Sequence, residues 1–191
     1  HLERNLFNGR VETTDENLQM RFTGLADLRG RWPLVDFTAD VQHADLKALG
    51  FSKAPGYNAL NLQVRANGRL SPDSLRGSLD LHGISYCAGG IDYDLGDVRL
   101  ESDRAMGENI LRLDASFAQA EVRGTFLPTK LPQALEHVIY SVFPALGDQV
   151  VYNQQPQDFR FDLTARRTDD ILGLFVPGLA VDSGARFTGG L

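Results

Sequence analysis

Two aspartates, Asp92 and Asp94, are the residues whose spacing comes nearest to a catalytic arrangement. Alternate residues of an extended segment share one face, so these carboxylates could work together as a general acid and a general base. Asp169 and Asp170 form a second pair, adjacent in sequence. An enzyme or a sugar-binding sandwich built on Asp92 and Asp94 needs a polar cleft, and the sequence has no concentrated set of aromatic and polar residues to line one. The pattern is more typical of solvated carboxylates beside turns.

Histidine and cysteine offer little more. His43 and Asp45 stand two apart, while His82 and His137 lie elsewhere, and a metal site needs three or four converging ligands. Cys87 is the single cysteine, which excludes an internal disulfide, and no histidine or lysine adjoins it to lower the pKa of its thiol. No nucleotide-binding or hydrolase motif is present. The sequence therefore predicts no enzyme, no metal and no cofactor.

Composition and charge narrow the class of protein. The 191 residues are 42% hydrophobic and 23% charged, with a formal net charge of −6, and this length and composition predict a single domain over residues 1–191. Arg166 and Arg167 form the largest basic cluster, so a nucleic-acid partner is not expected. No apolar run is long enough for a membrane-spanning helix. Because the sequence starts at His1 and shows no signal peptide, we expect a segment of a longer protein.

The dominant signal is an alternation of apolar and polar residues with period two, which predicts a mainly β, antiparallel fold. Each such segment presents one dry and one wet face, and short turns rich in Gly, Pro, Asn and Asp separate the segments. The parity changes between Leu95 and Val98, where we expect a bulge or a tight turn. The alternating segments are 18–27, 35–42, 60–66, 78–82, 111–115, 120–126 and 159–166.

Helices are expected to be few. Residues 132–143 begin with a proline, which the first helical position tolerates, and carry an apolar stripe at helical spacing, which predicts one amphipathic helix ended by Pro144. Two shorter helical turns are expected at 44–49 and 169–175.

Two arrangements of the sheet are compatible with these dry, apolar faces. In a closed sandwich or barrel they bury one another. In a sheet that curls without closing, a U-shaped half-barrel, they line an open trough about 45–50 Å long, for which helix 132–143 is a candidate cover. The candidate trough-lining residues are Leu18, Met20, Phe22, Phe37, Val41, Leu60, Leu62, Val64, Leu79, Leu81, Leu111, Leu113, Val122, Phe126, Phe159, Phe161 and Leu163.

Eight short motifs follow one another over most of the chain. They are 44–49 (ADLKAL), 75–77 (LRG), 84–86 (ISY), 93–100 (YDLGDVRL), 111–116 (LRLDAS), 120–126 (AEVRGTF), 142–144 (VFP) and 171–177 (ILGLFVP). In this order they resemble the TamB-like branch of the AsmA-like superfamily, proteins of envelopes with two membranes.

The resemblance implies an open, folded sheet of the "β-taco" kind in a periplasmic protein whose parent is anchored in the inner membrane. It implies a non-enzymatic role, in which an apolar groove conducts phospholipid between the inner and outer membranes. The acyl chains would lie on the dry face and the headgroups at the wet rim. A TamA- or BamA-type outer-membrane barrel would be a partner through parts of the parent protein outside this chain.

The alternative is a scaffold that assists the assembly of outer-membrane β-barrel proteins by strand pairing. Open sheet edges pair readily with other strands. The edges are expected near Leu6–Val11 and Arg186–Leu191, where self-association is also possible.

Overall fold

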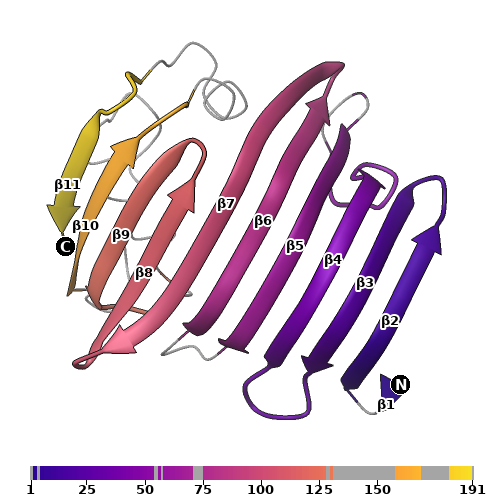
Figure 1. Ribbon diagram of the computed structural model, residues 1–191, viewed down its shortest axis with the longest axis horizontal. Helices are drawn as coiled ribbons and strands as arrows, with labels where there is room; N and C mark the ends of the chain where they lie inside the picture. Colours follow the sequence, from indigo (N-terminus) through magenta and orange to yellow (C-terminus); the bar gives the residue numbers. More distant parts are fainter. Residues whose placement is uncertain are drawn as a thin grey trace.

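The computed structural model of the chain is one antiparallel sheet whose eleven strands lie side by side in the order of the sequence (Figure 1). The structure describes residues 2–3, 5–53, 56, 58–70, 75–127, 130, 158–168 and 181–190. The strands are β1 (Leu2–Glu3), β2 (Leu6–Thr14), β3 (Leu18–Asp27), β4 (Leu34–Asp45), β5 (Asn58–Leu70), β6 (Leu75–Ala88), β7 (Ile91–Ala105), β8 (Glu108–Ala115), β9 (Ala118–Thr125), β10 (Asp158–Ala165) and β11 (Arg186–Gly190).

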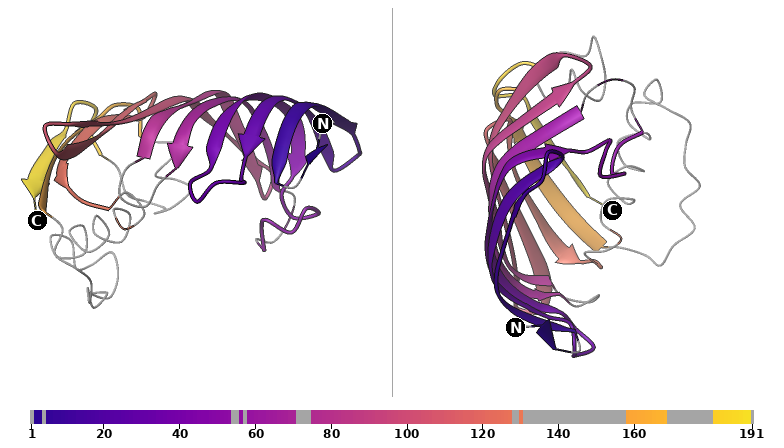
Figure 2. Two further views of the ribbon diagram at one scale, coloured as in Figure 1. Left: turned by 90° about the horizontal axis from the view of Figure 1, so that it is seen from below. Right: turned by 90° about the vertical axis from the view of Figure 1, so that its right-hand side faces the viewer.

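The sheet is bent and does not close. Seen from below and from the side, the strands bow so that the face turned to the viewer in Figure 1 is convex and the opposite face is concave (Figure 2). The β1–β2 end and β11 lie at opposite ends of the sheet, so neither a closed barrel nor a two-sheet sandwich forms in the described part of the chain.

Two-residue turns make several of the hairpins. Gly89 and Gly90, between β6 and β7, have φ of 60° and 85°, and Met106 and Gly107, between β7 and β8, have φ of 52° and 85°. Positive φ at both central residues is the type I′ geometry, whose twist matches that of the flanking strands. Both are short, glycine-containing turns of the kind that the sequence predicts between its alternating segments.

Bulges and glycines supply the curvature. The pairing register shifts in each of the pairs β3–β4, β4–β5, β5–β6 and β6–β7, and the irregularity expected near Leu95–Val98 is confirmed there, where Ile84 pairs with Gly96. Gly68 and Gly77 face each other with φ of 155° and 150°. A Cβ at Gly77 would lie 2.1 Å from the Asn67 carbonyl oxygen, so only glycine permits this close approach. Bulges and glycine kinks are the usual means by which a sheet is bent.

The prediction of helices is wrong for the part of the chain that the structure describes, which contains none. Residues 44–49 form no helix: β4 continues to Asp45, and a single hydrogen-bonded turn follows it, in which the Asp45 carboxylate accepts the N–H groups of Lys47 and Ala48, both at 3.0 Å. The Leu49 N–H donates to the Asp45 carbonyl at 3.0 Å, and the chain then turns at Gly50, with φ of 80°. A helix needs more than this single turn to offset the cost of nucleation. The expected helix 132–143, with its role as a cover, and the turn 169–175 lie outside the described residues.

Candidate functional site

The apolar face of the sheet is organised in rows that cross the strands. The Val64 row, named like the others after its residue in β5, joins directly paired residues from β2 to β8, and the Ala66 and Gly68 rows join such residues from β2 to β11. The Val64 row is Val11, Phe22, Ala39, Val64, Leu81, Val98 and Ala115. The Ala66 row is Gly9, Gly24, Phe37, Ala66, Leu79, Leu100, Leu113, Ala120, Leu163 and Phe187. The Gly68 row is Phe7, Ala26, Val35, Gly68, Gly77, Ser102, Leu111, Val122, Phe161 and Gly189.

These three rows carry no charge, and Ser102 is their one polar side chain. The ten strands from β2 to β11, at about 4.8 Å per step, give the Ala66 and Gly68 rows a length of roughly 43 Å. With about 6.7 Å between neighbouring rows, the three together cover on the order of 800 Å². Most of the side chains in the rows are half-buried, and Ala39, Ala66, Ala115 and Val122 are buried, so only part of this area is accessible to a partner.

All of the trough-lining residues predicted from the sequence lie on this one face. Phe22, Val64 and Leu81 belong to the Val64 row, while Phe37, Leu79, Leu113 and Leu163 belong to the Ala66 row, and Leu111, Val122 and Phe161 to the Gly68 row. The remaining residues flank the rows: Met20, Val41 and Leu62 pair in succession, Leu18 and Leu60 both pair with Ala44, Phe159 pairs with Gly124, and Phe126 packs on Phe159.

Sequence reasoning missed part of the face. Val11, Val35, Val98 and Leu100 belong to the rows but were not among the predicted lining residues. Val98 and Leu100 follow the irregularity in β7, which interrupts the alternation. Phe187 lies in a strand of only five residues, too short to show a period. The sequence signal that this strand offers is the two-residue spacing of Phe187 and Gly189, which lie on the same face of β11.

The apolar side chains are half-buried over most of the face, and packing is tight at one place. Val122, Phe126 and Phe159 are 6%, 4% and 2% exposed and form a compact cluster with Leu111 and Phe161. All the other predicted lining residues are half-buried. Over β2–β6 the face therefore keeps accessible apolar surface.

Aromatic rings mark the β2–β4 end of the face. The rings of Phe7 and Phe22 meet edge to face with centroids 5.4 Å apart, and those of Phe22 and Phe37 lie 4.9 Å apart. These rings come from three successive strands, β2, β3 and β4, and each belongs to a different one of the three rows. Such contacts hold large apolar side chains in place at little conformational cost.

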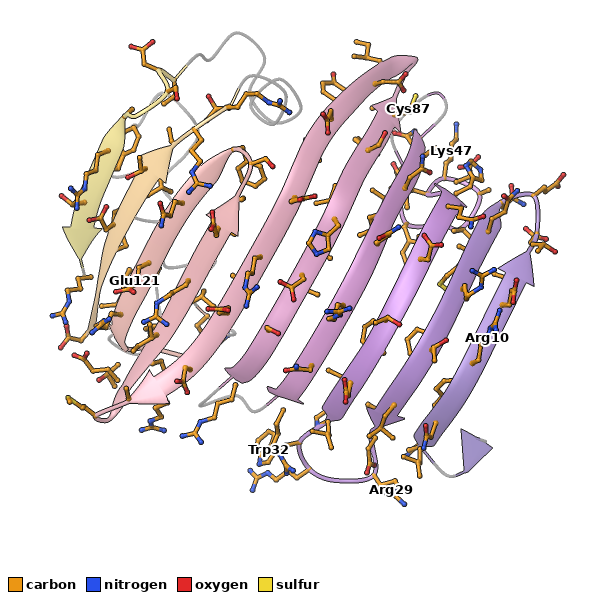
Figure 3. All side chains as sticks on the ribbon, in the orientation of Figure 1. Arg10, Arg29, Trp32, Lys47, Cys87 and Glu121 are labelled. Carbon is orange, nitrogen blue, oxygen red and sulfur yellow. The ribbon has the colours of Figure 1, made fainter. Side chains whose placement is uncertain are left out.

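The opposite face is charged and lies on the convex side. Arg10 and Glu121 project toward the viewer in Figure 3, from the face that Figure 2 shows to be convex. Ion pairs link neighbouring strands there, such as Arg112 with Glu121 at 2.9 Å and Arg99 with Asp80 at 3.6 Å. Exposed pairs of this kind contribute little to stability, so their main effect is to keep this face hydrated.

Neighbouring arginines lower the pKa of several carboxylates on this face. The hydrogen bonds from Arg29 lower the pKa of Asp27 to about 2, and those from Arg21 and Arg10 lower the pKa of Glu12. A hydrogen bond from Arg186 likewise lowers the pKa of Asp162. These groups stay ionised at neutral pH, which makes the two faces of the sheet sharply different in polarity.

The polar candidates from the sequence are not brought together into a reactive site. Asp92 and Asp94 are exposed and lie on the polar side of β7, where Asp94 meets Arg167 at 3.4 Å. His82 lies 3.5 Å from Asp97, also on the polar face. A hydrogen bond with Asp92 raises the pKa of the Cys87 thiol. The residues that the structure describes contain no cluster of three or more potential metal ligands. His137, Asp169 and Asp170 lie outside them.

Comparisons of the chain with protein-family models, with curated proteins and with solved structures find no match. Among the described residues, no helix is both long and apolar enough to cross a membrane. The face defined by the three rows is therefore the feature on which a function can be argued.

Proposed function

We propose that the apolar concave face binds the acyl chains of phospholipids and guides them across the strands. The observation that carries this proposal is the uncharged succession of directly paired residues in the Ala66 row, from Gly9 in β2 to Phe187 in β11. An acyl chain is linear, apolar and without polar groups along its length. It fits a continuous row better than a pocket with a few specific partners.

The energetics favour such an occupant. Each methylene removed from water contributes roughly 0.8 kcal/mol, so eight methylenes against the face contribute about 6 kcal/mol before the cost of ordering the chain. Because the lining side chains vary little in polarity from strand to strand, a bound chain meets no large barrier when it shifts along the row. The headgroup stays at the wet rim, and transfer needs no chemical step.

The likeness of the sequence motifs to TamB-like proteins supports the same proposal and extends it. On this view the chain works in the periplasm as a non-enzymatic part of a parent protein anchored in the inner membrane. The groove carries phospholipid between the inner and outer membranes, and a TamA- or BamA-type barrel is engaged by other parts of the parent.

Native mass spectrometry of the purified chain tests the proposal, because bound phospholipid adds a defined mass. Leu62 lies half-buried on the apolar face, and Leu62→Asp places a charge beside the Val64 row. The matched control is Gln63→Asp, since Gln63 is exposed on the opposite face of the same strand. We expect lipid on the wild type and on Gln63→Asp, and its loss from Leu62→Asp while circular dichroism still reports the sheet. A folded wild type that never carries lipid, even after incubation with vesicles, contradicts the proposal.

A barrel-assembly scaffold would give a different result. Its contacts would come from the backbone at the two ends of the sheet, so photo-crosslinks to barrel strands would arise from β1, β2 or β11 and not from Leu62. The rows favour the lipid proposal, because strand pairing alone does not require an uncharged surface on the strands between the edges.

A further inference from the structure

The two ends of the sheet are complementary, and we infer that the β11 edge of one molecule pairs with the β2 edge of a second copy, with Phe187 opposite Val11 and Arg186 opposite Glu12. This inference does not depend on the lipid proposal, because it concerns the edges of the sheet and not the occupant of its face.

Strand direction permits this contact. All neighbouring strands are antiparallel, so β2 and β11, nine steps apart, run in opposite directions (Figure 1). A second copy placed in the same orientation beside β11 therefore presents its β2 antiparallel to β11. In the described part of the chain β11 pairs only with β10, and β1 covers β2 only at Leu6 and Phe7.

The hydrogen-bonding groups at the two edges are in phase. The Leu28 N–H donates to the Asn5 carbonyl at 2.7 Å, and the Ala165 N–H donates to the Ala185 carbonyl at 2.8 Å. Since hydrogen-bonded pairs alternate along an antiparallel ladder, the backbone groups of Arg10 and Glu12 point away from β3, and those of Arg186 and Thr188 point away from β10. All four residues lie on the polar face, so pairing them brings the apolar faces of the two copies onto the same side.

The side chains fix the register. With Arg186 opposite Glu12, opposite charges are neighbours on the polar face, where each residue already has a partner of opposite charge in its own molecule. On the apolar face Phe187 meets Val11, and these two are 38% and 42% exposed, which is high for large apolar residues within strands. Aromatic and β-branched residues are a favourable cross-strand pair.

Two further pairs complete this register, Thr188 with Arg10 and Gly189 with Gly9, and the glycine pair repeats contacts already present in the sheet. Gly9 lies opposite Gly24, and Gly68 lies opposite Gly77. The contact uses residues 9–12 of β2 and leaves the part covered by β1 untouched. Repeated head to tail, it joins the apolar faces of successive molecules into a longer trough.

Disulfide trapping tests the register. In a Cys87→Ser background, Glu12→Cys with Arg186→Cys places the two cysteines in one cross-strand pair between copies, whereas within one molecule they lie roughly 43 Å apart. Arg10→Cys with Arg186→Cys is the control, displaced by two residues. We expect disulfide-linked dimers and higher oligomers from the first combination, formed about tenfold faster than from the second. Equal rates overturn the proposed register.

A proline substitution tests the edge itself. Thr188→Pro removes an N–H that points away from β10, so the molecule's own ladder is preserved while the contact between copies loses a hydrogen bond. We expect the variant to fold and to associate about tenfold or more weakly than the wild type in light scattering, as the loss of one backbone hydrogen bond implies. A wild type that is monomeric at its highest soluble concentration overturns the inference, and so does unchanged association of Thr188→Pro.

Discussion

Replacing Gly77 by alanine should strongly destabilise the sheet, although it leaves every other residue of the apolar rows unchanged. A Cβ at this position would lie 2.1 Å from the Asn67 carbonyl oxygen and 2.6 Å from the Gly68 Cα, and both are backbone atoms that cannot swing aside. The φ of Gly77 is 150°, a conformation that side-chain-bearing residues rarely adopt. Backbone strain of this kind costs about 1–3 kcal/mol, and relieving the contact requires moving β5 relative to β6. We expect a total loss of about 3 kcal/mol or more in the free energy of unfolding.

Two glycine substitutions calibrate this value. Gly83→Ala meets no atom within 4 Å but imposes a φ of 60° on alanine, so it should cost about 1–2 kcal/mol. Gly30→Ala meets only ordinary contacts, the nearest at 3.6 Å, and should change stability by less than about 0.5 kcal/mol. Urea unfolding followed by circular dichroism gives the three values. For a domain of this length the Gly77→Ala loss corresponds to a fall in Tm of about 6–12 °C. If Gly77→Ala is as stable as Gly30→Ala, the close approach of β5 and β6 is not as described, and the account of the curvature fails.

Three further predictions concern turns and charges. Met106→Asn should stabilise the chain by about 0.5–1 kcal/mol in urea unfolding, since Met106 is exposed at a positive φ that asparagine tolerates better; a loss of stability would contradict the type I′ geometry. Asp92→Asn should speed alkylation of Cys87 at pH 8, because the hydrogen bond with Asp92 raises the pKa of the thiol; an unchanged rate would show that this contact is absent in solution. Arg29 holds the pKa of Asp27 at about 2, against 3.8 unperturbed, so the contribution of this ion pair to stability is present above about pH 4 and is lost between pH 4 and pH 2. Arg29→Gln should therefore flatten the pH dependence of the free energy of unfolding between pH 4 and pH 2. An equally steep profile in the variant would rule this contribution out.

The sequence predicted which residues of each strand lie on the apolar face, because period-two alternation is a local signal. Leu60, Leu62 and Val64 lie on the apolar face as the alternation of β5 predicts. The alternation also predicted an antiparallel arrangement, since the turns between segments are short. The lining role of these residues stays a prediction, because their position shows what they can contact and not what they bind.

Other features were not predictable because they depend on neighbouring strands. The bulges that align from β3 to β7 are defined by pairing, so the sequence of β7 alone does not place Val98 and Leu100 in register. Gly68 and Gly77, taken singly in the sequence, disfavour a strand, and their role becomes clear only from their pairing opposite each other. Residues 44–49 form one turn and no helix: the Asp45 carboxylate caps this turn while the Asp45 backbone still belongs to β4, which the sequence of the segment alone does not show.

The most direct test of lipid binding on the concave face is site-specific photo-crosslinking along the Ala66 row. A benzophenone side chain is placed at Phe37, Leu79 or Leu113, and at Thr38 or Asp114 on the opposite face as matched controls, and the protein is irradiated with vesicles of labelled phosphatidylethanolamine. The account predicts lipid adducts from the three row positions and few from the controls. Equal labelling of both faces, or no adducts from the row in a folded protein, would contradict it.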